Sequence, residues 1–278
     1  MRPDTRAIEG RLGARAASFL DLACLDSVAS TNEVVKEAIR GQAPEGRAVI
    51  AFEQTDGYGR QGRFWASPPG GLYLSLLLRP LDRGKPLQET PTLSLVLALA
   101  ARNALVAQGC TFPIQLKWPN DVVCAQGKLC GISLEAVDGA LCVGIGLNLF
   151  QPAQAQALDG RYIPAYAVTL MQRDDLPASA HPDGLTASQA AFYEEAAAAL
   201  LSETVRLYHQ WLDGGFASVR DEYQAHAALR GQTVRLLSPA DGVLHEGRAC
   251  GVDAQGRLSL LDARGSVTPV HSGEVHLI

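Results

Sequence analysis

The stretch LKWPNDVVCAQGKLCGISLE, residues 116–135, decides the fold of this chain. Its apolar runs predict strands, and AQG at 125–127 predicts the turn that joins them. A hairpin of this length returns Lys128 to the side of the Asn120–Asp121 turn. Taken separately, the turn and the lysine fit an ordinary solvated hairpin. Held at one site, however, an ammonium and a carboxylate suit chemistry that forces two anions together, because nearby charges lower that cost.

Patterns on both sides of this hairpin predict an α+β fold with a mixed or antiparallel sheet and helices packed on it. A capping box of Ser30 and Glu33 predicts a helix that ends at Gly41, and a second box of Thr186 and Gln189 starts a long Ala-rich helix. Further predicted strands are 48–54, 71–80, 140–150 and the short piece 166–171; further predicted helices are 91–108 and 217–230.

The composition changes near Arg230. Beyond it, short β-type runs alternate with DG, EG, QG and RG turns, a spacing typical of a small antiparallel barrel. We therefore expect a large domain at 1–230 and an SH3-like barrel of about five strands at 231–278.

Charge and composition exclude several classes of protein. The formal net charge of −5 argues against nucleic-acid binding through a basic surface. The longest apolar run, 95–101, is too short to span a bilayer, and the N-terminus lacks the apolar core of a signal peptide. Six scattered cysteines without C-x-x-C pairs indicate reduced, buried thiols in a cytoplasmic protein.

A second chemistry-bearing motif is QTDGYGRQGRFW, residues 54–65. Its glycines permit close approach of backbone N–H groups to an anion, and Arg60 and Arg63 supply charge and planar donor forks. Trp65 offers an aromatic face for a base. A surface turn with solvated arginines explains the loop equally well. The string matches neither a P-loop nor a Rossmann fingerprint.

Together these motifs resemble those of biotin protein ligases. That family carries a Gln before a Gly-Arg-Gly-Arg-x-Gly-Arg loop, a Trp two residues later, and the strings K-W-P-N-D, K-L-x-G-I-x-x-E and G-I-G-x-N. The chain carries these motifs, with one departure, at 54–65, 117–121, 128–135 and 144–148, and its STN at 30–32 is similar to the family's biotin-binding segment. It departs at Tyr58, where the family has the first arginine of the loop.

The resemblance implies the biotin/lipoate ligase-like fold and a set of site residues. Lys128 and Arg60 would be catalytic. Biotin would contact Ser30, Thr31, Asn32, Gln54, Tyr58, Gly59, Arg60, Lys128 and Gly131. The adenylate would contact Arg60, Arg63, Trp65, Lys117, Asn120, Asp121, Lys128 and Asn148, and Asp121 would also hold Mg²⁺. We also expect loop 57–64 to be mobile in the free enzyme and ordered when the adenylate is bound.

By the same resemblance, the substrates are biotin and ATP, and the acceptor is a lysine on a biotin carboxyl carrier domain. Only about twenty residues precede the match, too few for the DNA-binding module of some members. The expected enzyme therefore binds neither nucleic acid nor membrane and is a monomer or homodimer. Two alternatives stay open: a lipoate or octanoate ligase, and a biotin-binding protein with reduced catalysis.

Overall fold

The computed structural model describes residues 1–153, 163–238 and 242–278. A seven-stranded mixed sheet forms its centre, in the order β1-β2-β3-β7-β6-β5-β4. Its strands are β1 (Asp21–Val28), β2 (Arg47–Gln54), β3 (Leu72–Leu78), β4 (Gln115–Lys117), β5 (Asp121–Cys124), β6 (Gly127–Val137) and β7 (Ala140–Leu147). The helices are α1 (Thr5–Glu9), α2 (Ala14–Phe19), α3 (Thr31–Arg40), α4 (Leu93–Ala107), α5 (Ala167–Met171), α6 (Ala187–Gly214) and α7 (Arg220–Ala225). The predicted α+β class is confirmed.

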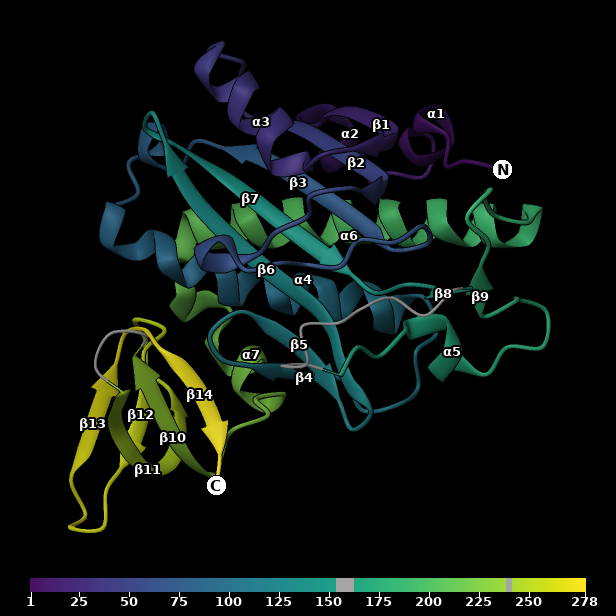
Figure 1. Cartoon of the computed structure of the whole chain (residues 1–278). Helices are drawn as coiled ribbons and strands as arrows, with labels where there is room; N and C mark the ends of the chain where they lie inside the picture. Colours follow the sequence, from purple (N-terminus) through teal and green to yellow (C-terminus); the bar gives the residue numbers. More distant parts are fainter. Residues whose placement is uncertain (154–162, 239–241) are drawn as a thin grey trace.

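The two faces of the sheet are covered by different helices (Figure 1). Alternate residues of β2, β3 and β7, such as Ile50, Leu76 and Val143, join the large core with α4 and α6. The residues between them, such as Val49 and Leu77, pack in a smaller cluster with α3. This alternation follows from the two-residue period of a strand. Because α3 is short, part of its face of the sheet is left without a covering helix.

Helix α4 packs against both the sheet and α6, and ten of its residues are buried. With the 3₁₀ turn before it, the segment Leu87–Ala107 is long and apolar enough by length and composition to cross a membrane. The sequence prediction, which considered only the run 95–101, therefore underestimated the length of this apolar segment. Two-thirds of the most apolar window is buried inside the protein, as in the core helix of a soluble domain.

The two capping predictions have different outcomes. Thr186 and Gln189 form the reciprocal capping box at the start of α6, which confirms that prediction. Helix α3 does run from Thr31 to Arg40, but the Ser30 side chain makes no capping hydrogen bond. The side chain of Glu33 instead accepts hydrogen bonds from Lys36 and Tyr58. The predicted box at Ser30 is therefore wrong in its bonding, although the helix limits are right.

Two predicted elements differ because tertiary contacts override local patterns. The piece 166–171, predicted as strand-like, is helix α5, and its first two backbone N–H groups donate to the carbonyls of Asn148 and Leu149. The helix predicted for 217–230 ends at Ala225. After it, His226 and Ala228 exchange backbone hydrogen bonds with Leu116 of β4, and a helix could not make these bonds.

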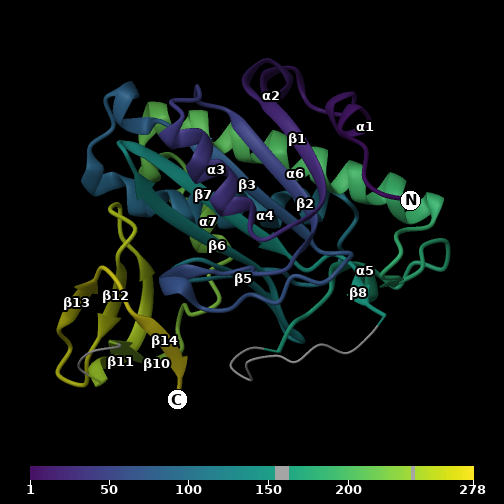
Figure 2. The same ribbon diagram turned by 45° about the horizontal axis from the view of Figure 1, so that its top comes forward.

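A second, five-stranded antiparallel sheet forms the C-terminal part, in the order β13-β12-β11-β10-β14. It stands at one end of the molecule, away from α1 and α2 (Figure 2). Its strands are β10 (Thr233–Ser238), β11 (Gly242–Val252), β12 (Leu258–Leu261), β13 (Val267–Val270) and β14 (Glu274–Leu277); two short strands, β8 (Gln151–Pro152) and β9 (Ser179–Ala180), pair elsewhere. The expected small β unit of five strands is confirmed.

Candidate active site

A cavity of about 610 Å³ lies over the part of the sheet that α3 leaves uncovered. Three cross-strand rows of the sheet lead from the residues under α3 to the floor of the cavity, where glycines appear. Next to α3 the row is Leu77–Cys142–Glu135; the next is Ser75–Gly144–Ser133, and the third is Tyr73–Gly146–Gly131. Directly paired residues point to the same face of a sheet. The glycines and serines of β3, β6 and β7 therefore create the space.

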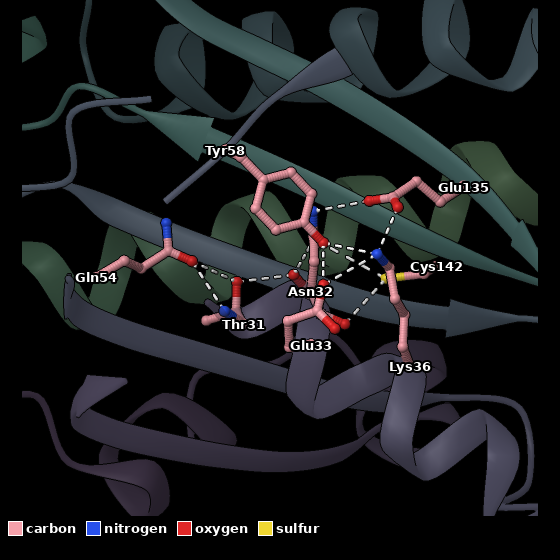
Figure 3. A network of polar contacts seen from close by, with 9 residues as sticks. Thr31, Asn32, Glu33, Lys36, Gln54, Tyr58, Glu135 and Cys142 are labelled. Carbon is pink, nitrogen blue, oxygen red and sulfur yellow. Dashed lines mark hydrogen bonds and ion pairs between the residues drawn. The ribbon is translucent and has the colours of Figure 1, made fainter. Parts of the chain in front are cut away.

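One end of the cavity is lined by polar side chains that hold one another in place (Figure 3). Gln54 Oε1 accepts from Thr31 N and Thr31 Oγ1, at 2.8 and 3.0 Å. Ser75 Oγ lies 2.7 Å from Thr31 Oγ1 and 2.6 Å from Asn32 Oδ1. A Cβ at Gly144 would come within 2.5 Å of Asn32 Oδ1, so only glycine accommodates this arrangement. These fixed donors and acceptors suit a small polar ring.

Trp65 lines the cavity and packs on the glycines of its floor, Gly131 and Gly146. Its ring centroid is 5.0 Å from Lys128 Nζ. A Cβ at Gly146 would lie 2.6 Å from Trp65 Nε1, so the indole depends on that glycine. The Nε1 atom is buried and has no hydrogen-bond partner within the described chain. A buried polar atom of this kind costs free energy unless a ligand or water satisfies it.

Lys128 and Asp121 meet as the hairpin predicted. The distance from Lys128 Nζ to Asp121 Oδ1 is 2.7 Å, and the two side chains are 11% and 9% exposed. Pairing of β5 with β6 brings them together, with a register shift between Val122 and Val123. Asn148, predicted to face the nucleotide, donates its amide to the Lys128 carbonyl at 2.9 Å. It therefore also fixes the backbone of the lysine.

The arginines of the glycine-rich loop reach two different partners. Arg60 Nη1 donates to Asn120 Oδ1 at 2.8 Å. Arg63 forms an ion pair with Glu274 of β14, at 2.7 Å between Nη2 and Oε2. The loop is itself a small hairpin, because Trp65 N donates to the Gly57 carbonyl and Gly59 N to the Arg63 carbonyl. Both guanidinium groups are thus held at the cavity by residues outside the loop.

The structure brings almost every predicted site residue to one cavity. Ser30 is the exception: it is buried but does not line the space. The lining residues that the sequence did not single out include Phe64, Ser133, Gly144, Tyr166 and the segment 273–275. The GIG string was the available signal for Gly144. Nothing in the sequence pointed to 273–275, because strand β14 reaches the site through tertiary packing.

Metal binding and thiol chemistry have little support in the part of the chain that the structure describes. Within it, no group of three or more His, Cys, Asp and Glu side chains could hold a metal ion. All six cysteines are without disulfides. Burial raises the pKa of Cys110 and of Cys142 to about 12, so both thiols stay protonated at neutral pH.

Comparison with known proteins agrees with this geometry. A model described as the biotin/lipoate A/B protein ligase family matches residues 24–149, and one described as the biotin protein ligase C-terminal domain matches residues 230–277. A biotin–[acetyl-CoA-carboxylase] ligase from Mycobacterium tuberculosis is 31% identical over 99% of this chain and 96% of its own length. The chain belongs to the biotin protein ligase family.

Solved structures of biotin protein ligases also resemble this family member. A biotin complex of the R40G variant from Aquifex aeolicus is 27% identical, with a TM-score of 0.72 over 94% of this chain and 99% of that one. A complex of the Aquifex aeolicus ligase with biotin and ATP has a TM-score of 0.68 at 27% identity, covering 93% and 98% of the two chains. The predicted family and the predicted enzyme class are confirmed.

Proposed function

We propose that the enzyme condenses biotin with ATP to biotinyl-5′-AMP and transfers the biotinyl group to a lysine of a biotin carboxyl carrier domain. The observation that carries the proposal is the Lys128–Asp121 pair inside a cavity with a polar, closed end and an arginine-lined end. Two relatives of this chain are named biotin–[acetyl-CoA-carboxylase] ligase, which describes the same activity.

Biotin occupies the polar end of the cavity in this proposal. Its ureido ring carries N–H donors and a carbonyl acceptor, which match the amide and hydroxyl groups of Thr31, Asn32 and Gln54. The dithiolane ring of lipoate has no such groups and would leave those buried dipoles unpaired, at a cost in binding free energy. The polar end therefore favours biotin over the lipoate alternative. Tyr58, Gly59 and Gly131 line the same cavity.

The nucleotide occupies the other end. Arg60 and Arg63 provide guanidinium groups for phosphate oxygens, and Trp65 provides a face for stacking. Lys117, Asn120 and Asn148 line the cavity between them.

In the first step, a biotin carboxylate oxygen attacks the α-phosphorus of ATP and pyrophosphate leaves. In the second, the amine of the carrier lysine attacks the biotinyl carbonyl, loses a proton, and displaces AMP. Lys128 places an ammonium group where carboxylate and phosphate charge accumulate in both steps. Trp65 and the loop around it exclude water, which would otherwise hydrolyse the mixed anhydride.

Magnesium would enter the site bound to ATP, because the phosphate oxygens of ATP supply ligands for the ion. Asp121 remains the proposed protein ligand. An ion there would share that carboxylate with the Lys128 ammonium 2.7 Å away, so the fit is to a phosphate-bound ion and not to a resident one.

The cysteines and the net charge of the chain bear on the cellular location of the enzyme and on its binding partners. The free cysteines agree with a cytoplasmic enzyme, and the net charge of −5 agrees with a protein partner and not a nucleic acid. We propose a monomer or homodimer that meets the carrier domain as a macromolecular substrate.

The direct test is ATP–pyrophosphate exchange with biotin or lipoate as the second substrate. Exchange with biotin, followed by biotin transfer to a carrier domain, is the expected result. Exchange with lipoate alone would overturn the substrate assignment, and exchange with neither would leave a biotin-binding protein.

A further inference from the structure

Tyr58 occupies the loop position where the family has an arginine, and its hydroxyl is held by two charged residues of α3. Tyr58 Oη donates to Glu33 Oε1 at 2.5 Å and accepts from Lys36 Nζ at 2.7 Å. A phenol can do both, whereas a guanidinium has only donors and could not accept the bond from Lys36. The tyrosine therefore fits this site in a way that the family arginine would not.

Lys36 is the centre of this arrangement. Its ammonium also forms ion pairs with Glu33 and with Glu135 of β6, at 3.0 and 2.5 Å, and its side chain is only 12% exposed. Burial alone would lower the pKa of Lys36, but the hydrogen bonds that its ammonium donates to Glu135, Tyr58 and Glu33 outweigh burial and raise the pKa.

The network continues from Lys36 to the cavity wall. Glu135 gives one oxygen to Lys36 and accepts from Asn32 Nδ2 with the other, at 3.3 Å. Asn32 lines the polar end of the cavity. Figure 3 shows the chain of contacts from Asn32 through Glu135 and Lys36 to Tyr58. It joins three segments that are far apart in sequence: the start of α3, the C-terminal part of β6 and the first half of the loop.

Holding Tyr58 also holds the opposite arm of the loop. Tyr58 pairs with Phe64 in an isolated antiparallel bridge. The backbone bond from Trp65 N to the Gly57 carbonyl lies beside it, at 2.9 Å. An anchor at Tyr58 is therefore transmitted to Trp65, whose indole lies over Lys128.

We propose that Tyr58 is a positioning residue: with Glu33, Lys36 and Glu135 it latches the loop to the biotin end of the cavity before substrate binds. The expected consequence of this latch is retention of biotinyl-AMP, and that consequence rests on the proposed function. A loop anchored in advance loses less conformational freedom when it closes over the adenylate. If Tyr58 is anchored in the free enzyme, the part of the loop that we expect to be mobile is the segment after Gly59.

The first experiment compares Tyr58→Phe with Tyr208→Phe. Both variants remove one tyrosine hydroxyl that donates to a glutamate, but Tyr208 bonds Glu45, which the cavity does not include. In the free enzyme, Tyr58→Phe should speed hydrogen exchange of residues 57–65 about tenfold, the effect of losing a hydrogen bond to a charged group. Exchange of β6 and β7 should not change. Unchanged exchange in 57–65, or an equal increase in the Tyr208 variant, would overturn the latch.

A second measurement reads out function. Dissociation of preformed biotinyl-AMP should be about tenfold faster in Tyr58→Phe and should stay near the wild-type rate in Tyr208→Phe. Lys36→Met should reproduce the effect, and adding Tyr58→Phe to it should change little more, because both remove the same link. Additive effects would contradict a shared latch. If wild-type enzyme forms no biotinyl-AMP, the proposed function fails, and the exchange measurement on free protein still decides the latch.

Discussion

At the scale of single residues, the Lys128–Asp121 pair serves both stability and chemistry. Each charge is nearly buried and compensates the other, and the backbone of Lys128 is fixed by the Asn148 amide. Removing one partner leaves an uncompensated charge, which costs more than the intact pair contributes. The two roles can therefore be separated by mutation.

Lys128→Ala should lower biotin-dependent pyrophosphate exchange by about a hundredfold or more, because the cation at the reacting oxygens is lost. It should also lower the free energy of unfolding by about 3 kcal/mol, since Asp121 is left unpaired. In the double variant Lys128→Ala/Asp121→Asn, most of the stability should return while activity stays low. Denaturant unfolding and exchange assays measure the two effects; recovery of activity in the double variant would contradict the role of Lys128.

Glu33 gives a pH-dependent test. Hydrogen bonds from Tyr58 and from Lys36 lower the pKa of Glu33 below its ordinary value of 4.5. A lowered pKa in the folded state stabilises the protein above the unfolded-state pKa and loses that effect as pH falls. Wild type should therefore be more stable than Glu33→Gln near neutral pH, by less than about 1 kcal/mol because the side chain is half exposed. The difference should begin to shrink as the pH falls below 4.5 and vanish below the lowered pKa of Glu33 in the folded protein; a difference that grew in acid would contradict the assignment.

At the scale of elements, strands β3, β6 and β7 show how one sheet face becomes a binding site. Large residues lie where α3 covers the sheet, Ser75 bonds to Thr31 and Asn32 at the start of α3, and Gly144 and Gly146 line the cavity beyond it. The strands themselves were predictable from their apolar runs. Their cross-strand rows were not, because register depends on pairing between distant segments.

The difference between local pairing and pairing of distant segments also explains which site residues could be predicted. Lys128 and Asp121 belong to one local hairpin, so their spacing was enough to place them together. Ser30 was misjudged because a capping pattern allows a hydrogen bond but does not require it. Glu274 could not be found from sequence, since it joins Arg63 across more than two hundred residues.

Gly146→Ala tests the floor of the cavity. The new methyl group would lie 2.6 Å from Trp65 Nε1, so the indole must move. Affinity for a non-hydrolysable biotinyl-AMP analogue should fall about tenfold or more, from lost stacking and packing. Gly13→Ala is the control, because its nearest neighbour would be Ser202 Oγ at 3.7 Å. Calorimetric titration showing equal affinity in both variants would contradict the role of Gly146.

At the scale of the whole molecule, the C-terminal sheet contributes residues to the site. Residues 273–275 line the cavity, and Glu274 holds Arg63 of the loop. Trp118, inside the KWPND string, donates its indole N–H to the Gly256 carbonyl at 3.0 Å. The two sheets are therefore joined at the cavity itself.

Glu274→Gln should raise the KM for ATP several-fold, because Arg63 loses the carboxylate that positions it, and should leave the KM for biotin unchanged. The free energy of unfolding should change by less than about 1 kcal/mol, as for other partly exposed ion pairs. Glu246→Gln is a matched control, since its pair with Arg235 lies on the same sheet outside the cavity. Equal KM values for ATP in the two variants would contradict the link.

The bond from Trp118 has a consequence for exchanging C-terminal units between relatives. Its acceptor is a backbone carbonyl, so the bond depends on the shape of the 253–256 turn, which the Asp253 carboxylate holds by accepting from Gln255 N and Arg257 N. The turn also requires glycine at 256: its φ is +71°, and a Cβ would lie 3.0 Å from Leu95 Cδ1 and Thr92 Cγ2. A transplanted unit therefore needs the same turn length and that glycine, together with the Glu274 carboxylate that pairs with Arg63.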